Sequence, residues 1–320
     1  MQQNGLRLGV VMDPIEAIKP VKDSTFAMLL EAQSRGWTLF YLLQSDLRVR
    51  DGEAFGHVRP LAVKDHPKTW FVLESGQDLP LGDLDVILMR KDPPFDMEYI
   101  YTTYLLERAE EAGALVINRP AALRDINEKV SIARFAQCSP PTLIARDAGA
   151  MRAFLAEHGR IVVKPLDGMG GRSIFVIAEG DGNRNVILET LTDSGRRFAM
   201  AQAYLPEIAS GGDKRILLID GEPVPYALAR IPAEGEHRGN LVMGARGEGR
   251  ELTERDRWIC TQVGPALEQE GVLFAGIDVI GDYLTEINIT SPTGIREIDR
   301  AFSINVSARI MDAIEARLAR

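Results

Sequence analysis

Apolar residues in the first third of the chain alternate between short continuous runs and a segment with helical spacing. Leu6–Met12 and Trp37–Leu43 are apolar runs typical of buried strands. The segment between them repeats apolar residues along one helical face, and we expect Ser24 to cap this helix. Strand, helix and strand at this spacing predict a parallel βαβ unit.

The same pattern continues to about residue 120. A hairpin that turns at Asp51-Gly52 is predicted over residues 46–63. Strands are predicted at 85–89 and 114–117, and a helix from about 96 to 111 lies between them. We therefore expect residues 1–122 to form an open parallel-sheet α/β domain on the substrate side, with ligand-contacting loops at its strand ends.

Residues 123–320 have a different pattern, in which strands follow one another through short turns. Residues 118–140 are helical in pattern, a glycine-rich loop at 167–173 separates strands at 161–165 and 174–177, and Asp220-Gly221 joins strands at 214–219 and 224–231. The polar, glycine-rich segment 233–250 predicts a long flexible lid. Further strands are expected at 198–204, 273–280 and 284–289, and further helices at 254–270 and after Ser303, its expected N-cap.

Composition narrows the class of protein. The 320 residues include 37 Lys and Arg against 46 Asp and Glu, and the resulting net charge of −9 argues against a nucleic-acid partner. No signal peptide and no apolar stretch of about 18 residues is visible, so we expect no membrane segment and a cytoplasmic location. Two cysteines, Cys138 and Cys260, indicate neither a disulfide framework nor a zinc site.

Three polar residues interrupt the apolar strands near the C-terminus. Glu286 and Asn288 are two apart in one strand and share a face. A two-residue turn at Gly281-Asp282 places Asp278 on the other face, whereas a three-residue loop at 280–282 places it beside them. We infer the three-residue loop from the chemistry, because three oxygen donors suit Mg²⁺ with room for phosphate oxygens. The alternative is a set of solvated positions on a half-exposed hairpin.

Glycines and cations elsewhere suggest a phosphate site. The loop 167–173 brings backbone N–H groups within reach of phosphate oxygens. This loop alone is a weak indication of a phosphate site, and Lys164 on the preceding strand strengthens it. The pattern alone leaves Lys129 as either a site residue or a solvated helix residue. Arginines that could bind phosphate or carboxylate lie on the 214–230 hairpin and in the flexible segment: Arg215, Arg230, Arg238 and Arg246.

Taken together, these segments resemble the ATP-grasp superfamily, and specifically the bacterial glutathione synthetases. The resemblance covers almost the whole chain. One departure is Ala245, where the family usually has a second loop glycine, and this alanine would stiffen the lid slightly. The matching blocks are VMDPI at 11–15, KDSTFAMLLEAQ at 22–33, DVILMRKDPPFD at 85–96, RDINEK at 124–129, KPLDGMGGRSIF at 164–175, GDKRILLIDGEPVPYALARIP at 212–232, RGNLVMGARGE at 238–248 and 276–297 with TEINITSPTGIRE.

The resemblance implies an ATP-grasp module over 123–320, with a central lid lobe at about 129–205 and a catalytic lobe at about 206–320. It implies that ATP phosphorylates the cysteinyl carboxylate of γ-glutamylcysteine and that glycine then attacks, with Mg²⁺ or Mn²⁺ as the metal. Dipeptide and glycine are the expected partners, in a homodimer or homotetramer.

The resemblance also implies a role for each candidate residue. Asp278, Glu286 and Asn288 would hold the metal, and Arg215, Arg230 and Arg238 would act on the γ-phosphate and the substrate carboxylates. Arg90 would contact the dipeptide, and the lid at 233–248 would shield the acyl phosphate. The residues implied to bind ATP are Lys129, Lys164, Asp167, Gly168, Gly170, Gly171, Ser173, Gln202, Ala203, Tyr204, Leu205 and Asp213. Two alternatives stay open: a related ligase for another acid and amine, and a non-catalytic nucleotide-binding scaffold.

Overall fold

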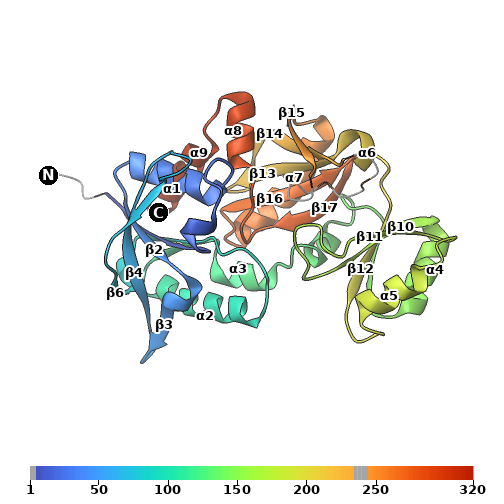
Figure 1. Ribbon diagram of the computed structural model, residues 1–320, viewed down its shortest axis with the longest axis horizontal. Helices are drawn as coiled ribbons and strands as arrows, with labels where there is room; N and C mark the ends of the chain where they lie inside the picture. Colours follow the sequence, from blue (N-terminus) through green and yellow to red (C-terminus); the bar gives the residue numbers. More distant parts are fainter. Residues whose placement is uncertain (1–4, 234–235, 237–238, 240–243, 320) are drawn as a thin grey trace.

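The computed structural model describes residues 5–233, 236, 239 and 244–319, and its strands form three sheets (Figure 1). A mixed sheet and its helices make up the N-terminal part. A small antiparallel sheet forms a separate lobe at the far end of the long axis. A second antiparallel sheet lies between them, so the chain has the α/β architecture with two antiparallel lobes that the resemblance predicts.

The N-terminal sheet has a parallel centre and antiparallel additions. Strands β2, β1, β7 and β8 run parallel in that order, and β4 joins the β2 edge antiparallel and pairs with β3, β5 and β6. Asp51-Gly52 turns the β3–β4 hairpin as predicted. The strands are β1 (Arg7–Val11), β2 (Thr38–Leu42), β3 (Leu47–Arg50), β4 (Glu53–Val63), β5 (Phe71–Leu73), β6 (Gln77–Pro80), β7 (Val86–Met89) and β8 (Leu115–Ile117).

The helices of this part begin at polar capping residues. Helix α1 (Ser24–Ser34) begins after Asp23, whose carboxylate accepts the N–H of Phe26, and α2 (Met97–Glu111) is capped in the same way by Asp96. The expected cap Ser24 is therefore wrong by one residue. Short helices connect the strands: η1 (Ile15–Ala17), η2 (Gln44–Asp46) and η3 (Leu81–Asp83).

The segment predicted as helical at 118–140 is only partly so. It holds α3 (Pro120–Asp125) and the 3₁₀-helix η4 (Val130–Phe135), and it leads into the antiparallel lobe of order β11-β10-β12-β9. Two helices missed from the sequence, α4 and α5, complete this lobe. Its elements are β9 (Thr142–Ala145), α4 (Ala148–His158), β10 (Arg160–Pro165), β11 (Phe175–Ala178), α5 (Arg184–Thr192) and β12 (Ala199–Ala203).

The C-terminal sheet has the order β15-β14-β13-β16-β17, all antiparallel. Asp220 and Gly221 both have positive φ and make the two-residue turn between β13 and β14. Strand β15 begins inside the segment 233–250, which was predicted as a flexible loop. The prediction of a loop is therefore wrong for residues 246–250. The elements are α6 (Ile208–Gly211), β13 (Asp213–Ile219), β14 (Glu222–Ile231), β15 (Arg246–Glu251), α7 (Glu254–Gln269), β16 (Phe274–Ile280), β17 (Tyr283–Asn288), α8 (Ile295–Phe302) and α9 (Val306–Leu318).

Ser303 is not the N-cap of the terminal helix. It adopts a left-handed conformation at the C-terminus of α8, a helix missed from the sequence, and Asn305 caps α9 by accepting the N–H of Ala308. Because serine serves either helix end, the residue type alone does not decide between them.

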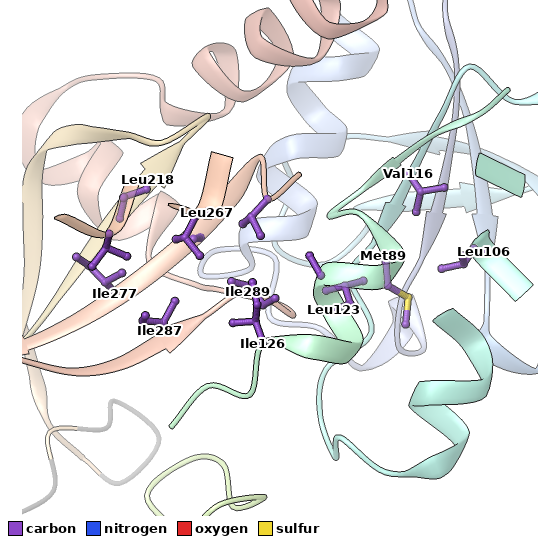
Figure 2. Close-up of a cluster of buried hydrophobic side chains, with 14 of the residues drawn as sticks. Met89, Leu106, Val116, Leu123, Ile126, Leu218, Leu267, Ile277, Ile287 and Ile289 are labelled. Atoms are coloured by element: carbon purple, nitrogen blue, oxygen red, sulfur yellow. The ribbon is translucent and has the colours of Figure 1, made fainter. Parts of the chain in front are cut away.

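One hydrophobic cluster runs from the N-terminal sheet into the C-terminal sheet (Figure 2). Met89, Leu106 and Val116 belong to the first sheet and its helix, and Ile277 and Ile287 belong to the second. Leu123 and Ile126, in and after α3, lie between them and join the two groups. Because the cluster is continuous, the N-terminal part and the C-terminal sheet pack as one core, which holds the loops at their junction in place. No helix within the described residues is long and apolar enough to cross a membrane.

Candidate active site

A cavity of about 360 Å³ lies where the three sheets approach one another. The central lobe lines it with the glycine loop and the end of β12, and the C-terminal sheet lines it with β13, β14, β16 and β17. The loop after β7 contributes Asp92 and Pro93. Charged side chains from the glycine loop, the C-terminal sheet and the loop after β7 therefore line one cavity, the usual setting of a small-molecule site.

A β-bulge brings Asp278 to the face of Glu286 and Asn288. Ile280 pairs with Tyr283, so the turn has two residues, Gly281 and Asp282, and the three-residue loop that we expected is wrong. The register then shifts at Thr285, and Asp278 pairs with Glu286. The three side chains therefore share a face, as predicted, but for a different reason. The cause is one extra residue within strand β17, and not a longer turn between the strands.

Asp278 is the centre of an ion-pair network on this face. Arg215 Nε and Nη2 donate to its two carboxylate oxygens at 2.5 and 2.9 Å, and Arg230 Nη2 lies 3.0 Å from Oδ2. Burial by itself would raise the pKa of Asp278, but the two guanidinium groups outweigh it and hold that pKa well below its ordinary value. Asp278 is therefore a buried, permanently charged carboxylate that fixes both arginines.

Asp213 faces the same arginine from the neighbouring strand. Arg230 Nη2 donates to Asp213 Oδ2, and the other oxygen, Oδ1, is buried and has no hydrogen-bond partner among the described residues. Burial raises the pKa of Asp213 to about 7, and the nearby charges of Asp278 and Glu286 add to the effect of burial. This carboxyl group thus titrates near neutral pH inside the site.

Glu286 is shared by two buried lysines. Its Oε1 lies 3.2 Å from Lys164 Nζ and 3.8 Å from Lys129 Nζ. Burial opposes ionisation, but the two ammonium groups hold the pKa of Glu286 below its ordinary value. Lys129, which the pattern left undecided, lies in the cavity wall and also donates to the carbonyl of Gly168 at 2.7 Å.

The glycine loop forms another part of the wall. Gly168, Gly170 and Gly171 line the cavity, and the last two have positive φ. Asp167 and Ser173 are absent from the lining, and Asp167 lies 3.5 Å from Arg197 Nη2 instead. Lys129 holds the base of this loop through Gly168, so the loop and the lysines are coupled directly.

The end of β12 and the residues after it also line the cavity, with Gln202, Ala203, Tyr204 and Leu205. The N–H groups of Ala203 and Tyr204 donate to Pro141 and Arg160 carbonyls within the lobe. Among the described residues, Leu205 N–H donates to no backbone carbonyl. The chain leaves the sheet here, after Ala203, the last residue of β12.

Besides Asp167 and Ser173, three predicted arginines are not among the described residues of the cavity wall. Arg90 is buried beside it, where it donates to Thr25 Oγ1 at 3.0 Å and to the carbonyl of Pro292 at 2.9 Å. Arg238 lies outside the described residues. Arg246 is exposed on β15 and pairs with Glu248.

One wall of the cavity was not predicted from the sequence. Glu128 and the turn 290–293 line it, and Thr290 Oγ1 donates to Glu128 Oε1 at 3.0 Å. Burial raises the pKa of Glu128 despite the adjacent ammonium of Lys129. Glu128 lies in the block RDINEK, next to Lys129, and residues 290–293 lie in the block TEINITSPTGIRE, just after Asn288. Their closeness in sequence to two candidate site residues was the signal that could have predicted this wall.

Asp278, Glu286 and Asn288, on β16 and β17, are the candidate residues for a magnesium site. Asn288 Nδ2 lies 3.2 Å from Asp278 Oδ2, and Asp278 pairs with Glu286, so the three side chains are neighbours on the cavity face. No group of three His, Cys, Asp or Glu side chains within the described ranges is placed to hold a metal. Two carboxylates and an amide suit Mg²⁺, which usually keeps phosphate or water ligands.

Solved structures of other proteins share this fold. The D-cycloserine synthetase DcsG has a TM-score of 0.69 at 16% identity, covering 98% of this chain and 99% of that one. The ATP-grasp ligase PsnB has a TM-score of 0.61 at 19% identity and covers 99% of both chains. Both structures therefore share the overall fold of this chain, in which a lobe and a sheet meet at the lysine-lined cavity.

Sequence relatives specify the family. Residues 6–124 match the N-terminal domain of prokaryotic glutathione synthetase, and residues 128–303 match its ATP-grasp domain. The glutathione synthetase of Pseudomonas aeruginosa is 62% identical over 314 residues, and that of Escherichia coli K12 is 58% identical over 313 residues. Both alignments cover 98% of this chain and 99% of the relative. The chain belongs to the prokaryotic glutathione synthetase family, as the resemblance predicted.

Proposed function

We propose that this ligase joins glycine to the cysteinyl carboxylate of γ-glutamylcysteine, giving glutathione, ADP and phosphate. Family membership over nearly the whole chain supports the reaction. The observation that carries the assignment of the site is the cavity itself, where Lys129, Lys164, Arg215 and Arg230 surround Asp278 and Glu286. Such a dense set of cations is suited to a triphosphate and a carboxylate together.

In the first step a carboxylate oxygen of the dipeptide attacks the γ-phosphorus of ATP, and the bond to the β-phosphate bridging oxygen breaks to release ADP. Lys129 and Lys164 would hold the α- and β-phosphates, and the adenine would lie against residues 202–205. Arg215 and Arg230 would stabilise the negative charge of the transferred phosphoryl group. Both arginines are already fixed by Asp278, so little reorganisation is needed as that charge develops.

In the second step the amine of glycine attacks the carbonyl carbon of the acyl phosphate. The C–O bond breaks, inorganic phosphate leaves, and the amine loses a proton. A divalent cation held by Asp278, Glu286 and Asn288 would neutralise phosphate charge. Arg238 and the segment 233–248 stay proposed as the cover that excludes water, and Asp167, Ser173 and Asp213 stay proposed as nucleotide-side residues.

An isotope experiment tests this proposal. Oxygen-18 in the cysteinyl carboxylate should appear in the phosphate released during glutathione formation, because the attacking oxygen leaves with phosphorus. Lys164→Ala should suppress phosphate release and label transfer together. Label that stays wholly in the peptide would contradict the acyl phosphate. Turnover with another acid–amine pair, but not with this one, would indicate the related ligase instead.

A further inference from the structure

Residues 291–295, the turn between β17 and α8, form a wall of the cavity but are held from outside it. Ser291, Pro292 and Thr293 line the cavity. Gly294 and Ile295 begin helix α8, whose N-terminus has no capping side chain of its own. A helix end buried without a cap leaves N–H groups that need another acceptor.

That acceptor comes from the N-terminal domain. Ser24 Oγ accepts the N–H of Gly294 at 3.1 Å and the N–H of Ile295 at 3.2 Å. Ser24 is 1% exposed, so no water competes for these bonds. A serine 270 residues away thus caps α8 in place of a local residue.

A second connection runs from the same helix start to the same turn. Thr25 Oγ1 accepts from Arg90 Nε, and Arg90 Nη2 donates to the carbonyl of Pro292. The Arg90 guanidinium also lies over the Phe274 ring, 5.7 Å from its centroid. Arg90 is therefore held on three sides, and its contact with the cavity wall goes through Pro292.

We propose that Ser24, Thr25 and Arg90 are positioning residues that hold the 291–295 turn as the wall for the non-nucleotide substrates. The turn is attached to the N-terminal domain, whereas residues 202–205 belong to the central lobe, at the end assigned to adenine. This assignment of ends rests on the proposed function. Misplacing the turn should therefore weaken the binding of γ-glutamylcysteine or glycine and leave ATP unaffected.

Steady-state kinetics of Ser24→Ala and Thr25→Val test the proposal. We expect the KM of the dipeptide or of glycine to rise about tenfold, and the KM for ATP to stay unchanged. A tenfold change lies within the roughly 100-fold loss of rate that a 1 Å misplacement causes. Thr25→Ser keeps the hydroxyl and should restore the wild-type value. Asn305→Ala removes the cap of α9, away from the cavity, and should lower the melting temperature without changing any KM.

Hydrogen exchange tests the role of Ser24 without any catalytic turnover, and so does not depend on which reaction the protein catalyses. The Gly294 and Ile295 amides should exchange hydrogen faster in Ser24→Ala than in wild type or Asn305→Ala. Equal exchange, or a KM for ATP that rises in the same proportion as the others, would overturn the proposal. If wild type prefers a different acid and amine, the proposed function fails. The ratios of variant to wild-type KM, measured with that acid and amine, then still test the positioning role.

Discussion

Arg215 and Asp278 lie directly opposite each other on β13 and β16 and form a bidentate ion pair in a buried position. Both side chains are also part of the cavity wall. The pair therefore links the fold of the C-terminal sheet to the chemistry proposed for the cavity. A fixed guanidinium stabilises a developing negative charge without having to move.

Arg215→Lys keeps the charge but loses the planar two-point contact with Asp278. We expect kcat to fall by about 10²–10³, the usual effect of removing one fixed donor to a transition state. Arg317→Lys is the matched control, because Arg317 makes a comparable contact with Asp220 away from the cavity. It should lower stability and leave kcat unchanged. Equal kcat for both variants would remove Arg215 from the reaction.

Glu286→Gln replaces a charged oxygen donor with a neutral side chain of the same shape. Lys129 and Lys164 lose their shared partner, and the proposed metal site loses a carboxylate. We expect kcat to fall by about 10² or more with a retained circular dichroism spectrum, and Mn²⁺ binding measured by electron paramagnetic resonance to weaken. Activity and Mn²⁺ affinity at wild-type levels would exclude Glu286 from the site.

Asp213 should make stability depend on pH in a defined window. Its pKa is about 7 in the folded protein, against about 3.9 in an unfolded chain. The folded state therefore binds the proton more tightly, and the contribution of Asp213 falls as pH rises from about 4 to 7. Urea unfolding should show the free energy of unfolding of Asp213→Asn rising relative to that of wild type as pH increases from about 4 to 7. Above about pH 7 the difference between the two proteins should stay constant. A difference that moves in the opposite direction would contradict this environment for Asp213.

Gly276→Ala tests the packing beneath the ion pair. A Cβ at this position would lie 2.7 Å from Arg215 Cδ and 3.0 Å from Pro292 Cβ, so the alanine would displace both. We expect the free energy of unfolding to fall by about 1–3 kcal/mol, together with a lower kcat. Gly180→Ala is the control, since its Cβ meets nothing within 4 Å. Similar kinetics for the two variants would show that the Arg215 position tolerates the change.

Residue patterns predicted much of the site because its members interrupt apolar strands. Lys164, Asp278 and Glu286 each stand where a buried strand would otherwise carry an apolar side chain, and burying a charge is costly without a partner. That cost made them candidates before any contact was known. Glu128 and the 290–293 turn lie in polar segments, where nothing local distinguishes a cavity wall from a solvated loop.

The sequence by itself determined the α/β class, the order of most strands, and the kind of residue on the cavity face. Only the tertiary structure decided how those residues meet. The bulge at Thr285 aligns Asp278 with Glu286, because an extra residue in one strand changes the register that turn length alone would set. Ser24 caps α8 rather than its own helix, because packing brings its hydroxyl oxygen to the N–H groups of Gly294 and Ile295, about 270 residues away along the chain, while Asp23 caps α1. Periodicity reports which face a side chain takes within its own element, whereas partners from distant elements are set by packing.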